Sequence, residues 1–216
     1  MGLDIVLFVV AVLAGRVVPM FTNNAIAGAG AERSAWVERA ALASVLALLA
    51  ADLAGVSGPV LAALAFAAAA AQAARLHLWR WWRTRGTPLV WILHAAYAWI
   101  AVHLLLRALA ALDLVAAPLA THALTIGAIG GMTIGMMTRT AKGHTGRQLR
   151  TDRWEVACYA LVMLAAVLRV LVPLAWPAAY AASVTASAVC WALAFAVYAV
   201  RYWPVLTRPR VDGKPG

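Results

Sequence analysis

The chain has 216 residues, of which 65% are hydrophobic and only 12% are charged. A soluble domain is nearer half apolar and a quarter charged, so this composition excludes an ordinary soluble fold. The net charge of +10 could indicate nucleic-acid binding, but nearly all Lys and Arg lie between apolar runs, which instead indicates a lipid bilayer as the partner and no nucleic acid.

The apolar runs are long enough to cross a membrane and do not alternate as outer-membrane strands would. Because backbone polar groups must be paired within a spanning segment, these runs must be helices. We therefore predict an all-α polytopic bundle over residues 1–206, with a disordered cytoplasmic tail at 207–216. The seven expected spans are 3–21, 37–55, 59–79, 88–111, 117–138, 154–173 and 178–200.

Charge in the connectors predicts the orientation. The segments after the first, third and fifth expected spans and the C-terminal tail are rich in Arg and Lys, whereas the other three connectors contain none. Basic connectors face the cytoplasm, so the N-terminus is expected outside and the C-terminus inside. Tryptophans also cluster near the basic ends, as an interfacial aromatic belt does.

Ionisable residues within spans are costly in hydrocarbon, which makes them candidates for function. At ~1.5 Å of rise per residue, four of them fall in one layer near the expected outer surface. His94 lies in a different layer, nearer the cytoplasm. We expect the outer four to share a polar cavity in which one of the two arginines meets an acidic group. These four are His103, Arg107, His122 and Arg169.

The fifth expected span has two different faces. Its GxxxGxxxG row predicts close helix packing, and on the opposite face His122 and Met136 align with threonines. Imidazole can bind haem iron, copper or zinc, and thioether sulfur suits copper. The candidate metal ligands are therefore His94, His103, His122 and Met136, with Arg107 and Arg169 as cationic partners of a cofactor. Alternatively, each histidine simply hydrogen-bonds a neighbouring helix.

Two segments are polar beyond what spanning requires. GRVVPMFTNN (15–24) contains Pro19, which frees a backbone carbonyl, and a pair of asparagines expected to end the first helix. TRTAKGHTGRQLR follows the fifth span, with His144 between two glycines. This second segment could hold an anion as a donor-rich turn, or it could anchor the chain at lipid headgroups.

Both segments, GRVVPMFTNN and HALTIGAIGGMTIGMMTRTAKGHTGR (122–147), resemble the NnrS family, and PLVWILHAAYAW (88–99) fits between them. The resemblance implies a multi-pass protein of the bacterial inner membrane that contains haem and copper and is linked to nitric oxide metabolism, nitrosative stress resistance and denitrification. It also implies a chain about twice as long, of which this is the C-terminal part. A second copy or a partner chain would then supply the missing half. The matching positions are Arg16, Pro19, Asn24, His94, His122, Arg139, His144 and Arg147.

Three functions remain open from the sequence. The first is a haem- and copper-binding protein of the nitric oxide response. The second is a transporter or permease, although no inverted repeat is visible. The third is a truncated structural remnant of a longer protein. Catalysis is not indicated, because no nucleophile with its base, no paired carboxylates and no nucleotide-binding loop are apparent.

Overall fold

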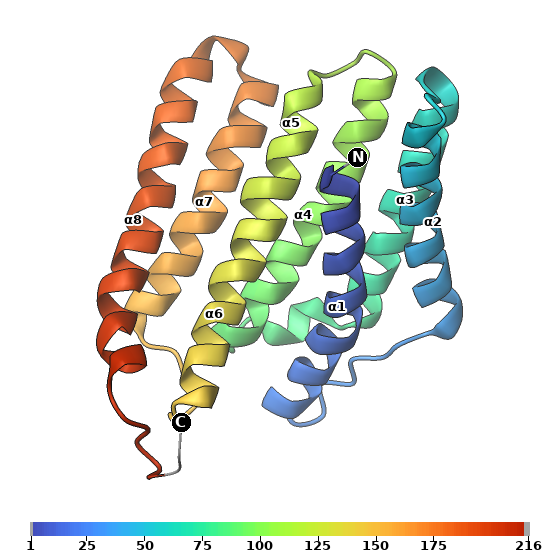
Figure 1. Ribbon diagram of the computed structural model, residues 1–216. Coiled ribbons are helices and arrows are strands. Elements are labelled where there is room, and N and C mark those ends of the chain that lie inside the picture. Colours follow the sequence, from blue (N-terminus) through green and yellow to red (C-terminus); the bar gives the residue numbers. More distant parts are fainter. Residues whose placement is uncertain (1, 214–216) are drawn as a thin grey trace.

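The computed structural model describes residues 2–213, which form seven rods of helix and no strand (Figure 1). The all-α fold class is thus confirmed. The fifth rod combines two α-helices with a π-helix, η2, between them, and short 3-10 helices, η1 and η3, precede the fourth and seventh rods. In chain order the elements are α1 (Gly2–Ala25), α2 (Ala35–Leu53), α3 (Gly58–Leu78), η1 (Trp81–Thr84), α4 (Pro88–Ala111), α5 (Ala117–His122), η2 (Ala123–Gly130), α6 (Gly131–His144), α7 (Arg153–Ala175), η3 (Pro177–Ala179) and α8 (Tyr180–Thr207).

Within the described chain, six of the seven rods are long and apolar enough to cross a membrane. The exception is α2, which carries Glu38, Arg39 and Asp52 within 19 residues. Two of these charges have partners on other helices: Glu38 pairs with Arg75, and Asp52 pairs with Arg107. The charge that lowers the hydropathy of α2 is therefore partly used to attach it to the bundle.

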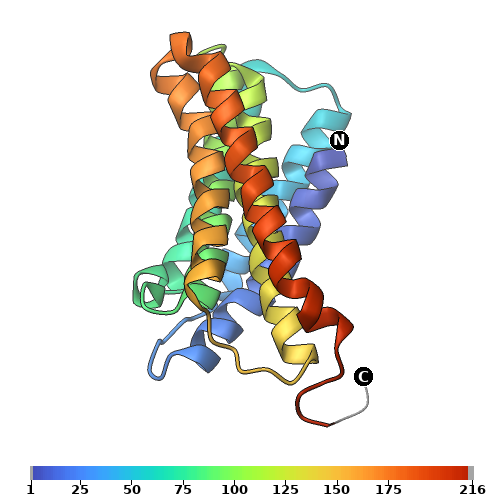
Figure 2. The ribbon, with the colours of Figure 1, turned by 90° about the vertical axis from the view of Figure 1, so that its left-hand side faces the viewer.

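The rods run up and down, so the connections fall at two opposite ends (Figures 1 and 2). The connections after α1, α3 and α6 and the end of α8 lie at one end, which we call the basic end. The connections after α2, α4 and α7 lie at the other, which we call the neutral end. The charge separation expected from the sequence is therefore a property of the fold. That the basic end faces the cytoplasm remains a prediction.

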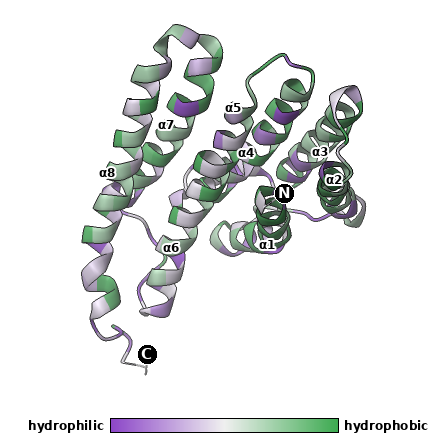
Figure 3. Cartoon of the chain, turned by 45° about the horizontal axis from the view of Figure 1, so that its top comes forward, coloured by the Kyte–Doolittle hydropathy of each residue, from purple (hydrophilic) through white to green (hydrophobic). Residues whose placement is uncertain are grey.

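Many large apolar residues face outward, although others fill the core, and at several places a small residue is buried beside an exposed large one. Leu13 is 57% exposed while its neighbour Ala14 is 5% exposed, and Leu193 is 50% exposed beside the fully buried Ala194. Hydrophobic residues extend along most of each rod (Figure 3). Close backbone approach through small residues, with aliphatic side chains left for lipid, is the packing expected within a bilayer.

Helix α4 lies at the centre of the bundle. It contacts α1, α3, α5, η2, α6 and α7, and has more buried residues than any other helix. At the outside, α8 packs mainly on α7, and α2 packs mainly on α3. A polar side chain on α4 therefore meets protein on several sides, which makes this helix the natural place for a buried site.

A buried arginine joins the first four helices. Arg75 of α3 forms two hydrogen bonds to the carboxylate of Glu38 at 2.7 and 2.8 Å. It also donates to the carbonyl of Ala11 and to the hydroxyl of Tyr97, which in turn donates to Gln72. All donors of such a guanidinium must be satisfied when it is buried. This network ties α1, α2, α3 and α4 together near the basic end.

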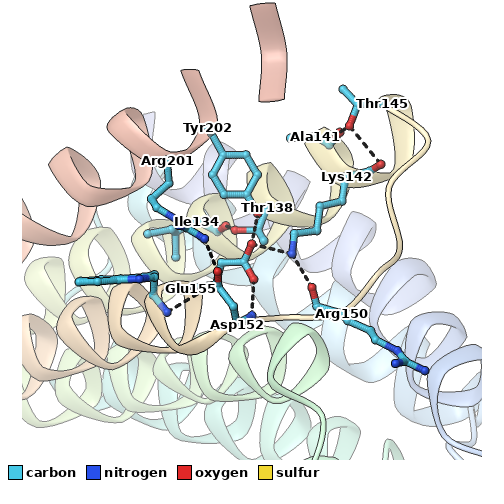
Figure 4. Close-up of polar contacts among 11 residues, drawn as sticks. Ile134, Thr138, Ala141, Lys142, Thr145, Arg150, Asp152, Glu155, Arg201 and Tyr202 are labelled. Atoms are coloured by element: carbon cyan, nitrogen blue, oxygen red, sulfur yellow. Dashed lines mark hydrogen bonds and ion pairs between the residues drawn. The ribbon is translucent and has the colours of Figure 1, made fainter. Parts of the chain in front are cut away.

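A second polar cluster joins the last three rods (Figure 4). Asp152 caps α7 by accepting from the backbone N–H groups of Trp154 and Glu155, while Glu155 accepts from the N–H of Asp152. This is a capping box. Glu155 also pairs with Lys142 of α6 at 2.6 Å and accepts from Tyr202 of α8 at 2.6 Å. One buried carboxylate therefore fixes α6, α7 and α8 at the basic end.

Helix α1 ends at Ala25, directly after the asparagines that were expected to end it. Helix α6 continues to His144, which was expected to lie in a turn, so this segment is more helical than expected. Asn23 does act in a turn, since its amide exchanges two hydrogen bonds with the backbone of Ala31. In the tail, the N–H of Val211 donates to the carbonyl of Thr145; residues 214–216 of the expected disordered segment lie outside the described residues.

Candidate functional site

The three segments that carry the family resemblance meet inside the bundle near the basic end. Thr22 of the first segment contacts His94 of the second, with 2.8 Å between Oγ1 and Nε2. Arg139 of the third lies over the ring of Phe21 at 3.7 Å from its centroid. Residues far apart in sequence are thus brought together on α1, α4 and α6. This convergence makes the surroundings of His94 the leading candidate site.

The hydrogen bonds around Thr22 determine which nitrogen of His94 carries the proton. The single hydroxyl hydrogen of Thr22 is donated to the carbonyl of Val18 at 2.8 Å. Toward His94 the hydroxyl can only accept, so Nε2 of His94 is the donor. In the neutral ring Nδ1 then holds a lone pair. That atom is buried and has no hydrogen-bond partner among the described residues.

His94 lines a cavity of about 650 Å³ between α3, η1 and α4. This volume is in the range of small-molecule and cofactor sites. His94 is itself 3% exposed, and its ring packs edge-on against Trp79. The walls are mostly apolar, with polar and aromatic groups contributed by His77, Trp81, Thr84, Arg85 and Trp91.

Sequence reasoning missed the part of this cavity that lies on α3 and η1. His77 falls in the last turn of α3, and Trp81 and Arg85 follow it. In the sequence they belong to a Trp- and Arg-rich connector, which is also typical of an interfacial anchor. A detectable signal was the presence of a second histidine at the same end of the bundle as His94.

At the neutral end, Arg107 meets two carboxylates. Its guanidinium lies 2.6 Å from Asp4 of α1 and 2.5 Å from Asp52 of α2. An outer-layer arginine does pair with acidic groups, as expected, but the expected shared cavity is not formed, because Arg107 and its carboxylates do not line the cavity of His122 and Arg169. Because an unpaired charge in hydrocarbon is costly, this triad attaches α1 and α2 to the central helix.

The other outer-layer residues divide between two surroundings. His103 is buried, and its Nδ1 donates to the carbonyl of Ala120 at 2.7 Å, which leaves its Nε2 without a partner among the described residues. His122 accepts at Nε2 from Arg169 at 2.9 Å. His122 and Arg169 also line a second cavity, of about 550 Å³. The two histidines therefore have different partners, and only His103 keeps an unused lone pair.

The rod from α5 to α6 contains the glycine row. A Cβ atom at Gly127 would lie 2.3 Å from the ring of Trp99, and one at Gly135 would lie 2.9 Å from Leu93. Both clashes are with α4, so the predicted packing surface is confirmed. The π-helix η2 begins directly after His122, and its wider turn changes the 100° step used to align His122 with Met136. Met136 lies ~20 Å further along the rod at ~1.5 Å per residue, so these two residues do not share a metal ion.

The remaining matching positions fall into two groups. Pro19 is buried in α1, and Arg139 and Arg147 are half-buried, with Arg147 donating to the carbonyl of Val205 at 3.5 Å. The others are exposed. These exposed residues are Arg16, Asn24 and His144.

The described residues contain no group of three or more His, Cys, Asp or Glu side chains that could hold a metal ion. The residues that line the His94 cavity suit a mostly apolar cofactor with acidic groups. They include the imidazole of His94, the indole rings of Trp81 and Trp91 and the cationic side chain of Arg85.

Comparison with known proteins gives one positive result. A family model described as NnrS protein matches residues 1–210, nearly the whole chain. A search of curated proteins found no match, and neither did a search of solved structures.

Proposed function

Because the chain belongs to the NnrS family, we propose that this multi-pass membrane protein binds haem in the cavity beside His94 and acts in nitric oxide metabolism or resistance to nitrosative stress. Family membership supports haem and copper as cofactors and the bacterial inner membrane as the location. The single observation that carries the proposal is the buried, unpartnered Nδ1 of His94 at a cavity of about 650 Å³.

The residues around the cavity have separate roles in this proposal. Thr22 accepts from Nε2 of His94 and so orients the ring and fixes its tautomer, as outer partners of metal-binding histidines do. Trp81 and Trp91 supply apolar walls, and Arg85 supplies positive charge for carboxylates. When bound, haem would supply an iron centre that takes nitric oxide as a ligand. The protein's part is to hold the cofactor and exclude water.

Copper is proposed only because the chain belongs to the NnrS family. Residues 2–213 contain no group of three or more His, Cys, Asp or Glu side chains that could hold a metal ion, and we propose that a second copy or a partner chain completes the copper site. His103 is the residue of this chain that we propose as a copper ligand, because its Nε2 is buried and has no hydrogen-bond partner among the described residues. His122 is less suited, since Arg169 occupies its lone pair.

Purification from haem-replete cells tests this function. We expect a Soret absorption band, about one haem per chain by pyridine haemochrome assay, and slower growth of a deletion strain under a nitric oxide donor. Copper is expected only in preparations that retain the partner or the second copy. Protein that is colourless and free of metal, from a strain with unchanged tolerance, would contradict the proposal.

A further inference from the structure

The second cavity lies at the neutral end, far along the bundle from His94. It has a volume of about 550 Å³ and is lined by the connection before α5, the start of α5, the last turns of α7 and the start of α8. Most of its walls are apolar. Its polar groups are only three, His122, Arg169 and Tyr180.

Arg169 differs from the other outer-layer arginine, Arg107, because no carboxylate of the described residues neutralises its charge. Arg107 has two carboxylate partners. Within residues 2–213, Arg169 forms no ion pair: its Nη2 donates to His122, its guanidinium lies 5.6 Å from the Tyr180 ring centroid, and its Nη1 is buried without a hydrogen-bond partner. A cation in this layer needs an anion, and the described chain does not provide one.

The hydrogen bond between these two residues also sets the chemistry of His122. A guanidinium only donates, so Nε2 of His122 accepts and the neutral ring carries its proton on Nδ1. Arg169 and His122 therefore present only N–H donors to an additional ligand, and the Tyr180 hydroxyl is a further potential donor. Positive charge with several donors and no acceptor carboxylate matches a phosphate group, which guanidinium binds well.

We propose that this cavity binds a phosphate group through Arg169 and His122, independently of the haem function. The apolar walls, including Leu119, Pro173 and Leu174, and the position at the membrane edge fit the headgroup and upper acyl chains of an anionic phospholipid. Free phosphate from the aqueous side has the same charged chemistry but would leave these walls uncovered.

Thermal unfolding of the full chain in neutral detergent tests the site. Wild type is compared with Arg169→Met after adding phosphatidylglycerol, phosphatidylcholine or inorganic phosphate. We expect phosphatidylglycerol to raise the Tm of wild type by several degrees, and Arg169→Met to lose this increase. Without added lipid, the variant should unfold near the wild-type temperature, because the loss of the hydrogen bond to His122 is offset by removal of a cation that has no ion-pair partner. Arg208→Gln, which removes an exposed charge in the tail, should respond as wild type does.

The two sources of phosphate are separated by the third addition. An increase with phosphatidylglycerol alone identifies lipid, and an increase with inorganic phosphate as well identifies a site open to the free anion. Ala116→Trp, which fills the cavity and keeps Arg169, should also abolish the response and covers the case in which Arg169→Met does not fold. Equal responses of wild type and the folded variants, or no response of wild type to either phosphate source, would overturn the proposal.

Discussion

The Oγ1 atom of Thr22 lies 2.8 Å from Nε2 of His94, and its hydrogen is already donated to Val18. This contact joins the first helix to the central helix, and among residues 2–213 the other nitrogen of the imidazole has no hydrogen-bond partner. Thr22→Val keeps the shape of the side chain and removes the acceptor. We expect this variant to retain the fold and to bind haem more weakly, by about 10-fold or more, as loss of such outer partners does. Haem titration followed at the Soret band measures the change.

The buried pair of Arg75 and Glu38 should dominate the stability of the first four helices. Glu38→Ala removes the carboxylate and leaves the buried guanidinium without its anion, which costs about 3–5 kcal/mol of unfolding free energy. Glu32→Ala is the matched control, because its pair with Arg80 is exposed and contributes at most about 1 kcal/mol. Denaturant unfolding in detergent would show comparable losses for both variants if the Arg75 network were unimportant.

Gly15 is required because the side chain of Arg75 packs directly against its Cα atom. A Cβ atom at this position would lie 1.5 Å from Nη2 of Arg75. Gly15→Ala should therefore displace the guanidinium from Glu38 and lower the Tm. Gly143→Ala is the control, since nothing lies within 4 Å of a Cβ atom there; in a helix this change should stabilise by about 0.5–1 kcal/mol. Opposite signs of the two Tm shifts are expected, and a neutral Gly15→Ala would contradict this packing.

The predicted orientation can be tested by cysteine labelling. In a background with Cys158 and Cys190 replaced by alanine, Leu114→Cys places a thiol at the neutral end and Leu149→Cys places one at the basic end. A membrane-impermeant maleimide should label position 114 in intact spheroplasts and position 149 only after permeabilisation. The reverse pattern would invert the topology without changing the fold.

The α7 cap should depend on pH. Burial raises the pKa of Asp152, but hydrogen bonds from the N–H groups of Glu155 and Trp154 and the nearby Arg201 outweigh it and hold the pKa below 3.8. The carboxylate is thus favoured in the folded state. Its contribution is complete above the unfolded pKa and is lost as pH falls through the lowered value. Asp152→Asn should remove this acid sensitivity of the Tm, which begins as the pH falls below about 4, the ordinary pKa of an unfolded Asp; an unchanged pH profile would refute the role of the charge.

The sequence predicted the parts of the structure that depend on composition along the chain. Seven apolar runs gave seven rods, and the glycine row gave the contact of the fifth rod with α4. Which partners the histidines have depends instead on the rotation of each helix about its axis. His103 and His122 have matching expected depths, yet one bonds a backbone carbonyl and the other bonds Arg169.

Two further features, the π-helix η2 and the His94 cavity, could not be predicted from the periodicity of apolar residues. The π-helix after His122 changes the phase of the residues that follow, and an alignment at 100° per residue cannot anticipate it. The His94 cavity includes residues of a connector whose tryptophans and arginines also satisfy the rule for interfacial anchors. The local sequence was equally compatible with a regular α-helix in the first case and with an interfacial anchor in the second. Only the tertiary packing shows which structure forms.

The most direct test of the central claim is haem binding by His94→Gly compared with His144→Gly. His144 is exposed at the basic end, so its variant controls for loss of an imidazole. We predict that His144→Gly retains the Soret band and about one haem per chain, that His94→Gly loses both, and that added imidazole restores the band of His94→Gly. Equal haem content in wild type and both variants would contradict the assignment of His94 as the ligand.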